Sequence, residues 1–285
     1  MNAYLRLLRP QQWIKNIFVF AGLIFSRQFH DATSLLRSAG AFIVFSLLSS
    51  GGYIINDVLD YREDRFSPAK SKRPVASGAI ARGRALGLGI LLIAVSVALS
   101  FFINRYFLVV GLVYLALMVL YSLKVKQVVL LDVLFVAIAY VLRSVAGAVA
   151  IKVEISSWLI VCSFLLALFM VLTKRRGEML GENARNQRKV LAYYSTELLD
   201  QLIVIAVSAC IVSYCIYTLA PETVIKFHTK KLVYTVPIVI YALFRYLYIS
   251  REKAGSAMPD RLLFTDAPLL ISVILWAGAC ILLLF

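Results

Sequence analysis

The stretch SAGAFIVFSLLSSGGYIINDVLDYRED (residues 38–64) joins an uncharged run to a cluster of acidic side chains. Crossing a bilayer takes about 20 apolar residues in a helix, because each residue rises about 1.5 Å and the hydrocarbon core is about 30 Å thick. The run that ends at Asn56 meets this requirement, and it predicts a membrane span over residues 34–56. The acidic cluster would then lie at the membrane surface.

The rest of the chain repeats this apolar pattern. Of its 285 residues, 61% are hydrophobic, and the mean hydropathy is +0.85. These values exclude a soluble globular enzyme and a disordered protein. Continuous apolar runs, rather than alternating ones, favour helices over a transmembrane barrel. The sequence therefore predicts an all-α, polytopic membrane protein, a bundle of about nine transmembrane helices, at 13–29, 34–56, 85–103, 106–122, 128–151, 156–173, 197–219, 232–250 and 266–285.

The distribution of basic residues indicates the orientation of these spans. The chain has 30 Lys and Arg against 15 Asp and Glu, a net charge of +15. With the N-terminus inside, 21 of the cations fall in inside segments and seven in outside segments, as the positive-inside rule expects. We therefore expect a multi-pass protein of the cell (inner) membrane with a cytoplasmic N-terminus. Topology and contacts with membrane lipids explain most of the charge, and no nucleic acid is needed.

The acidic cluster consists of Asn56, Asp57, Asp60 and Asp64. At about 100° per residue, these side chains share an arc of roughly 100° on one helix face. Like charges this close repel, and Mg²⁺, which typically takes one or two carboxylates plus substrate phosphates, removes the repulsion. The alternative is a solvated helix end whose acids pair with neighbouring arginines, although acids are disfavoured at a helix C-terminus. The pattern favours a Mg²⁺–diphosphate site, with Asp57 and Asp60 as the catalytic carboxylates.

Basic residues near the cytoplasmic ends of the spans are candidates for phosphate contact. Lys72 and Arg73 lie in a loop with two prolines and a glycine (residues 67–78), and either phosphate contact or topology explains them. Lys174-Arg175-Arg176 ends the sixth span, where anionic-lipid anchoring is an equal alternative.

Three further positions are open to two interpretations. Arg143 lies in the middle of the fifth span, where an intramembrane cation is a functional-site hypothesis and a phosphate is its natural counter-ion. Lys124 ends the fourth span and could instead snorkel to the interface. Tyr194, with its neighbour Tyr193, could belong to an interfacial aromatic belt.

The motif Asn56-Asp57-x-x-Asp60-x-x-x-Asp64 resembles the first aspartate-rich motif of the UbiA-type membrane prenyltransferase superfamily. That superfamily normally carries a second aspartate-rich motif after the sixth span, where this chain reads KRRGE (174–178). The departure, together with RPQQWIKN (9–16), YSLK (121–124), VLRSVAG (141–147) and VLxxYS (190–195), resembles the decaprenyl-phosphate phosphoribosyltransferase branch.

This resemblance implies one UbiA-like transmembrane domain over residues 1–285. It also implies transfer of 5-phosphoribose from phosphoribosyl diphosphate to a polyprenyl (decaprenyl-like) phosphate, for cell-envelope glycan synthesis. In that reaction Mg²⁺ would be held by Asn56, Asp57, Asp60 and Asp64. The substrate-binding residues would be Lys15, Asn16, Lys72, Arg73, Lys124, Arg143, Lys174, Arg175, Glu178 and Tyr194.

Two other functions stay open at this point. One is a Mg²⁺-dependent prenyltransferase that joins a prenyl diphosphate to an aromatic or lipid acceptor. The other is a transporter of anionic lipids or metabolites, for which internal repeats and broken mid-membrane helices are the expected features. The sequence shows no clear repeat and its acidic cluster lies at the membrane surface, so a transporter is the less favoured of the two. The sequence is also compatible with a homo-oligomer.

Overall fold

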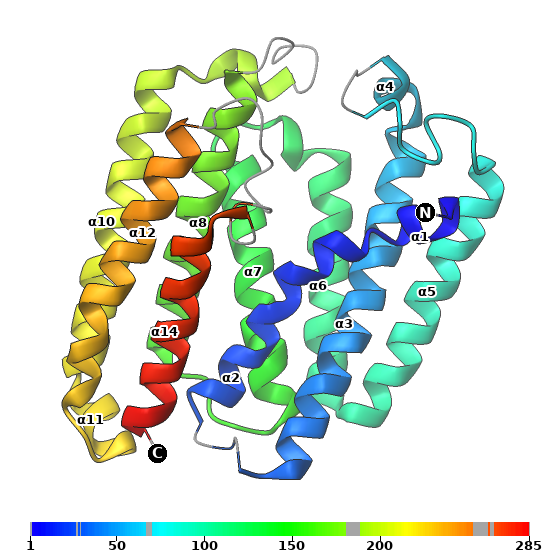
Figure 1. Cartoon of the computed structure of the whole chain (residues 1–285). Coiled ribbons are helices and arrows are strands. Elements are labelled where there is room, and N and C mark those ends of the chain that lie inside the picture. The colour runs from blue at the N-terminus through cyan, green and yellow to red at the C-terminus, as the bar shows by residue number, and fades with distance from the viewer. Residues whose placement is uncertain are drawn as a thin grey trace. The chain divides into compact units, whose positions relative to one another are not determined.

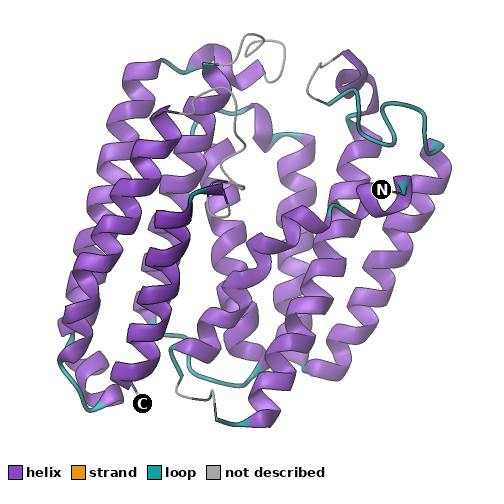
Figure 2. Ribbon diagram, in the orientation of Figure 1, coloured by secondary structure: helices purple, strands orange, loops and turns teal. Residues whose placement is uncertain are grey.

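The structure is a computed structural model that describes residues 2–26, 28, 30–66, 70–180, 189–252, 262 and 265–284. Over these residues the ordered elements are all helices, and no strand occurs (Figure 2). In the part of the chain that the structure describes, eight helices are long and apolar enough to cross a membrane. The prediction of an all-α, multi-pass membrane protein is therefore confirmed.

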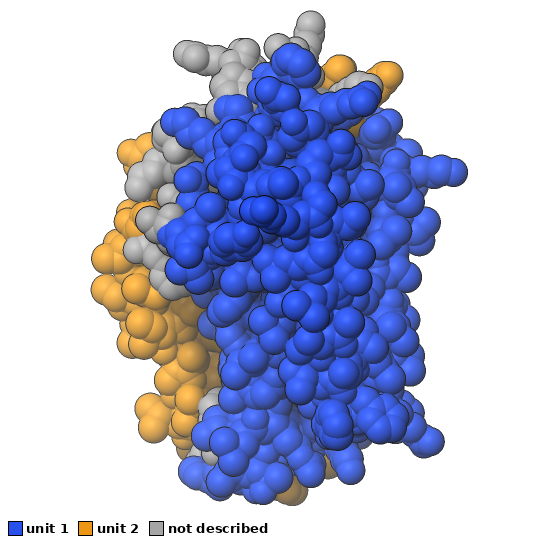
Figure 3. All heavy atoms as spheres, turned by 90° about the vertical axis from the view of Figure 1, so that its right-hand side faces the viewer, with its two compact units in different colours: residues 1–155 blue, residues 156–285 orange. Residues whose placement is uncertain are grey.

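The chain divides into two compact units, residues 1–155 and 156–285, coloured separately in Figure 3. The first unit contains α1 (Ala3–Leu8), the 3-10 helix η1 (Pro10–Phe20), α2 (Ala21–Ile24), α3 (Ala32–Leu59), α4 (Tyr61–Phe66), α5 (Arg82–Ile103), α6 (Arg105–Leu123), the 3-10 helix η2 (Val125–Gln127) and α7 (Leu131–Ala150) (Figure 1). The second contains α8 (Ser157–Met179), the 3-10 helix η3 (Lys189–Tyr193), α10 (Thr196–Leu219), α11 (Pro221–Phe227), the 3-10 helix η4 (Lys231–Thr235), α12 (Val236–Glu252) and α14 (Ala267–Leu284).

The long helices match the predicted second to ninth spans closely. With η4 and α12 taken together as one span (Lys231–Glu252), seven of them differ from the predicted bounds by three residues or fewer at each end. The exception is α8, which continues past the predicted end at residue 173 to Met179. Lys174, Arg175, Arg176 and Glu178 therefore lie on the last turns of a helix, where the cationic side chains can reach beyond the apolar part of the span.

The first predicted span, residues 13–29, is not one regular α-helix. It consists of the 3-10 helix η1 followed by the single α-helical turn of α2. At about 2.0 Å per residue for η1 and about 1.5 Å for α2, residues 10–24 cover about 28 Å, close to the thickness of a hydrocarbon core. The first unit thus contains a segment of transmembrane length with 3-10 geometry, which packs against α3 and α7.

Polar side chains set the starts of two long helices in the first unit. The Asp31 carboxylate accepts hydrogen bonds from the backbone N–H groups of Thr33 and Ser34, and so caps α3. Asn104 caps α6 through Phe107 N–H at 2.9 Å, and its Nδ2 donates to the carbonyl of Val149 at 2.8 Å. These contacts satisfy backbone groups that a helix end leaves unpaired, and the second one ties the start of α6 to the end of α7.

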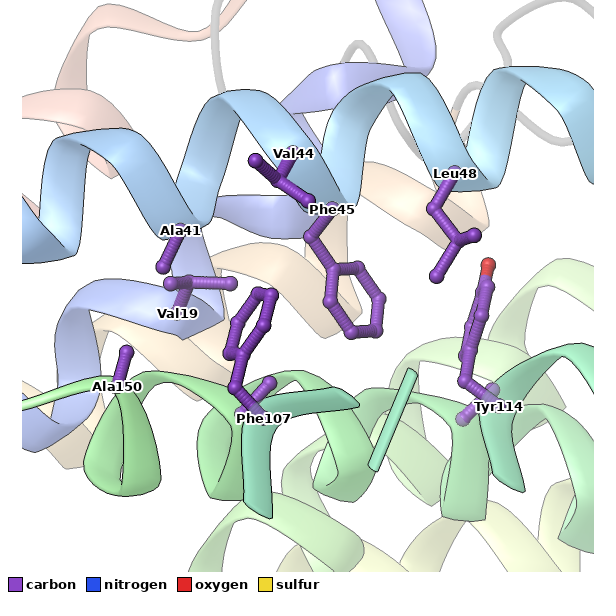
Figure 4. Packing of buried hydrophobic residues seen from close by; sticks show 10 residues of the cluster. Val19, Ala41, Val44, Phe45, Leu48, Phe107, Tyr114 and Ala150 are labelled. Atoms are coloured by element: carbon purple, nitrogen blue, oxygen red, sulfur yellow. The ribbon is translucent and has the colours of Figure 1, made fainter. Parts of the chain in front are cut away.

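The core of the first unit lies between η1, α3, α6 and α7 (Figure 4). Phe45 and Tyr114 are fully buried there, with ring centroids 4.7 Å apart. The backbones of η1 and α7 approach each other closely, since a Cβ added to Gly147 would lie 1.7 Å from the carbonyl oxygen of Val19. Only glycine fits at this position, so Gly147 lets η1 lie directly against α7.

Candidate metal and phosphate site

The predicted acidic cluster lies where α3 gives way to α4. Helix α3 ends at Leu59, and Asp60 separates it from α4. Backbone hydrogen bonds from Asp60 N to Asn56 O and from Asp64 N to Asp60 O, both 2.9 Å, continue the helical hydrogen-bond pattern through this junction. The contacts of the four side chains form two sets. Asn56 Nδ2 donates to Asp60 Oδ2 at 3.1 Å, whereas Asp57 and Asp64 share a contact to one arginine.

That arginine is Arg73, one of the predicted phosphate ligands. Its Nη1 lies 3.0 Å from Asp57 Oδ1 and 2.6 Å from Asp64 Oδ2, and Lys70 Nζ lies 3.8 Å from Asp64 Oδ1. Both carboxylates are buried, each with 1% of its surface exposed. Burial raises the pKa of Asp64 above its ordinary value, and the charges of Arg73 and Lys70 oppose this rise. The loop after α4 therefore holds cations directly on the acidic cluster.

A second arginine reaches Asp57 from the N-terminal segment. Arg9 Nη2 donates to Asp57 Oδ1, and the Arg9 guanidinium lies 5.6 Å from the centroid of the Tyr53 ring. Arg9 connects α1 to η1 in a left-handed backbone conformation, with φ of 52°. Sequence reasoning did not assign this residue to the site. The available clue was its place at the start of the RPQQWIKN block.

Asp60 receives its cation from the segment after α6. Lys126 Nζ lies 2.5 Å from Asp60 Oδ1, and both side chains are largely buried. The predicted ligand from this region was Lys124, whose side chain is exposed. Neither lysine has a local sequence feature that separates it from the other, because the contact depends on the tertiary placement of η2, which packs against α6 and α7.

The 3-10 geometry of η1 aligns the polar residues of the first segment. With three residues per turn, Trp13, Asn16 and Val19 fall on one row that faces α3 and α7. Trp13 Nε1 donates to Ser50 Oγ at 2.9 Å, and Asn16 Nδ2 donates to Ser46 Oγ at 3.0 Å and to Ser49 Oγ at 3.2 Å. The serines of α3 thus bind η1 along its length.

Arg143 is buried in the same network, in the middle of α7. Its Nε donates to Asn16 Oδ1 at 2.8 Å, its Nη1 to the carbonyl of Ala139 at 2.6 Å and its Nη2 to the Tyr114 hydroxyl at 2.9 Å. Its guanidinium also lies 5.0 Å from the Tyr114 ring centroid and 5.1 Å from that of Tyr140. These oxygens and rings stabilise a cation that would be costly in hydrocarbon. Two predicted site residues, Asn16 and Arg143, are therefore in direct contact.

The other predicted residues of the first unit lie at its surface or partly buried. Lys72 is exposed, and its backbone carbonyl accepts a hydrogen bond from Arg6 Nη2 at 3.0 Å. Lys15 is half-buried on η1. Their assignment to substrate stays a prediction.

The predicted residues of the second unit lie on α8 and, in the case of Tyr194, directly after η3. Arg175 is almost fully buried, and its Nη1 contacts Glu178 Oε2 at 2.7 Å. Lys174 is half-buried beside it, and Tyr194 is buried whereas its neighbour Tyr193 is exposed. The two tyrosines, which the sequence pattern did not distinguish, therefore differ in their burial.

Arg176, the third cation of the run, has a structural partner in the second unit. Arg176 Nε lies 2.6 Å from Asp200 Oδ1, and Arg251 Nη2 lies 3.0 Å from the same oxygen. Asp200 thus connects the ends of α8, α10 and α12. This contact favours a structural role for Arg176.

The chemistry of the acidic cluster fits Mg²⁺. Asp57 Oδ2 is buried and has no hydrogen-bond partner among the residues that the structure describes. Within the same residues, no three His, Cys, Asp or Glu side chains form a group that could hold a metal by themselves. Mg²⁺ does not require such a group, because it takes one or two carboxylates and completes its shell with water and phosphate oxygens. Asp57 and the amide and carboxylate oxygens of Asn56, Asp60 and Asp64 are the ligands available here.

Known proteins resemble this chain over nearly its whole length. A model of the UbiA prenyltransferase family matches residues 16–266. Decaprenyl-phosphate phosphoribosyltransferase of Corynebacterium glutamicum is 28% identical over 96% of this chain and 84% of its own, and that of Mycolicibacterium smegmatis is 28% identical over 98% and 91%. A solved structure of a UbiA homolog from Archaeoglobus fulgidus, bound to GPP and Mg²⁺, has a TM-score of 0.76 at 20% identity and covers 99% of both chains.

Proposed function

Because the chain belongs to the UbiA prenyltransferase family, we propose that it is a membrane transferase that moves 5-phosphoribose from phosphoribosyl diphosphate to a polyprenyl phosphate. The lipid would be decaprenyl-like, and the product would serve cell-envelope glycan synthesis. The similarity to two decaprenyl-phosphate phosphoribosyltransferases over nearly the full chain supports this activity. The family match crosses the boundary between the two compact units, which supports one functional domain over residues 1–285.

The observation that carries the proposal is the buried Asp57 carboxylate within a set of cations. One oxygen contacts Arg9 and Arg73, and the other has no hydrogen-bond partner among the described residues. An unsatisfied buried carboxylate oxygen is costly, and a divalent cation would satisfy it. The surrounding arginines are suited to the phosphate oxygens of a diphosphate. The site therefore fits a substrate that carries a diphosphate and a metal.

The proposed reaction exchanges one bond at C1 of the ribose. The bond between C1 and the diphosphate oxygen breaks, a bond forms between C1 and an oxygen of the lipid phosphate, and diphosphate leaves. Asn56, Asp57, Asp60 and Asp64 would hold Mg²⁺, which would neutralise charge on the leaving group. Arg73 and Lys126 would donate to the departing oxygens. The attacking phosphate is already anionic, so no strong general base is required.

The remaining predicted residues complete the proposal. Arg73 and the exposed Lys72, with Lys174, Arg175 and Glu178 on α8 and Tyr194 after η3, are proposed for the donor. Lys15, Asn16, Lys124 and Arg143 are proposed for the lipid phosphate. We also propose that the N-terminus and the acidic cluster face the cytoplasm at the inner membrane, since the excess of basic residues falls on that side.

Mass spectrometry of lipid products tests the activity. Purified protein incubated with phosphoribosyl diphosphate, Mg²⁺ and decaprenyl phosphate should yield a lipid that is heavier by one phosphoribosyl group, and chelation of Mg²⁺ should stop its formation. A folded protein that forms no such product under these conditions would refute the proposal.

A Mg²⁺-dependent prenyltransferase is the second candidate, with a prenyl diphosphate and an aromatic or lipid acceptor as substrates. The structure of the Archaeoglobus fulgidus homolog bound to GPP and Mg²⁺ favours it. The two functions differ in which group moves. Labelled prenyl diphosphate and labelled phosphoribosyl diphosphate, offered to the same protein with the respective acceptors, distinguish them.

A further inference from the structure

The acidic cluster already has more positive than negative charge around it. Three carboxylates, those of Asp57, Asp60 and Asp64, are in contact with four cations, namely Arg9, Lys70, Arg73 and Lys126. These groups together carry a formal charge of +1. A bare divalent cation would therefore enter a site that is already positive, and like charges that approach within a few ångströms repel.

Arg9 is the cation that most directly opposes the binding of a metal to Asp57. Its Nη2 donates to Asp57 Oδ1, an oxygen that also accepts from Arg73 Nη1 at 3.0 Å. A metal on Asp57 Oδ2 would lie only a few ångströms from these two guanidinium groups, which repel it, and a metal that binds both carboxylate oxygens has to displace the donors. Arg73 keeps a second carboxylate partner, Asp64, at 2.6 Å, whereas Asp57 is the carboxylate that Arg9 contacts.

The fold holds Arg9 at this place through the end of α1 and the start of η1. The Ser50 hydroxyl donates to the carbonyl of Leu8 at 2.7 Å and accepts from Trp13 Nε1 at 2.9 Å, so one residue of α3 binds both sides of Arg9. Ser50 and Asp57 lie on the same helix, two turns apart. The position of the Arg9 backbone relative to Asp57 is thus fixed by α3, and its long side chain is the part that can change partner.

We propose that Arg9 is an internal counter-ion of Asp57 that makes metal binding depend on the diphosphate. This inference rests on the proposed function of the acidic cluster. Without an anionic ligand, Arg9 and the metal compete for Asp57. When a diphosphate is present, its oxygens bind both the metal and the displaced guanidinium, so the competition is relieved. Metal and diphosphate then strengthen each other's binding, as linkage requires of any coupled pair of ligands.

The binding of Mn²⁺, used in place of Mg²⁺ and followed by electron paramagnetic resonance, tests this coupling on the purified full chain. In the wild type we expect weak binding of Mn²⁺ alone and tighter binding when inorganic diphosphate is added. Arg9→Gln should bind Mn²⁺ alone about ten-fold more tightly, which corresponds to the loss of one competing charged hydrogen bond. Diphosphate should then raise the affinity of this variant less than it raises that of the wild type.

Arg65→Gln is the matched control. Arg65 is an exposed cation next to Asp64 in the chain, but its Nη1 donates to the Tyr61 hydroxyl at 3.1 Å. Its removal should leave the affinity for Mn²⁺ unchanged. If Arg9→Gln is folded and binds Mn²⁺ no more tightly than the wild type does, the inference is wrong.

Chemical modification of the wild type gives a second test that does not depend on the folding of a variant. Phenylglyoxal modifies accessible arginines, and mass spectrometry of peptides reports the modification of Arg9. We expect slow modification without ligand, faster modification with Mn²⁺ alone and protection with Mn²⁺ plus diphosphate. A rate that does not change when Mn²⁺ binds would overturn the inference.

These results also separate the inference from the proposed function. If Mn²⁺ does not bind even with diphosphate, both fail. If Mn²⁺ binds, Asp57→Asn abolishes the binding and Arg9→Gln tightens it, the inference holds even when phosphoribosyl transfer is not observed.

Discussion

Lys126 Nζ lies 2.5 Å from Asp60 Oδ1, although the two residues are 66 positions apart in the chain. The contact joins the short 3-10 helix η2, after α6, to the end of α3. It supplies the acidic cluster with a cation from a part of the chain that lies outside the loop of residues 67–78. In the proposed reaction this lysine would be released from Asp60 when the metal binds, and it would then face the diphosphate.

Lys126→Ala should lower kcat/KM for phosphoribosyl diphosphate by about ten-fold, since a charged hydrogen bond contributes about 1.5 to 3 kcal/mol and partial exposure reduces its effect. Steady-state kinetics with a fixed concentration of lipid acceptor measures the change. Gln127→Ala is the matched control, because Gln127 is the exposed next residue of η2. Equal kinetics for Lys126→Ala and the wild type would contradict a role of this lysine at the diphosphate.

Asp57→Asn should abolish Mg²⁺-dependent transfer while the protein stays folded. The substitution keeps the size of the side chain and removes the charge, and the loss of even an outer partner of a metal site typically costs about 10- to 100-fold. We expect a fall in kcat/KM of more than about 100-fold. Glu63→Gln, at an exposed acid of α4, is the control and should retain activity. Activity of Asp57→Asn close to that of the wild type would refute the metal site.

Local sequence predicted the eight long helices because each one depends on a long, predominantly apolar run. It did not predict the 3-10 geometry of η1. A hydrophobic pattern read at about 100° per residue does not place Trp13, Asn16 and Val19 on one row, whereas three residues per turn do. The geometry becomes understandable only with the serines of α3 and with Gly147 of α7, which η1 contacts directly.

The acidic cluster shows the same division between local and tertiary information. The spacing of Asn56, Asp57, Asp60 and Asp64 predicted that these side chains lie near one another, and three of the acids do contact cations at the end of α3. Helix periodicity could not identify Arg9 or Lys126 as partners. Both come from segments far away in the chain, and their contacts follow from the packing of η1 against α3 and of η2 against α6 and α7.

Gly147→Ala should destabilise the protein. The added Cβ would lie 1.7 Å from the carbonyl oxygen of Val19, which belongs to the backbone of η1 and cannot rotate away. Overpacking of this kind costs about 1 to 3 kcal/mol, and a contact this short favours the upper part of that range. Thermal unfolding in detergent should show a lower Tm.

Gly87→Ala in α5 is the control for this substitution. A Cβ at Gly87 meets nothing within 4 Å, so alanine should raise the helix propensity at no steric cost and leave the Tm equal or slightly higher. If Gly147→Ala unfolds at the wild-type temperature, η1 has enough freedom to move away from α7, and the close approach is not a constraint on the fold.

The hydrogen bond between Asn16 and Arg143 can be measured with a double-mutant cycle. Asn16→Ala and Arg143→Lys each remove the 2.8 Å contact between η1 and α7, and lysine cannot reproduce the planar fork that also reaches Ala139 and Tyr114. We expect each variant to lower the free energy of unfolding and the pair to show a coupling energy of about 1 to 3 kcal/mol. Asn16→Ala combined with Arg65→Ala, which share no partner, should be additive.

The lipid kinetics of Arg143→Lys then separate two roles. If Arg143→Lys raises the KM for polyprenyl phosphate under conditions in which the variant is fully folded, Arg143 binds the phosphate. If the KM is unchanged, the role of Arg143 is to hold η1.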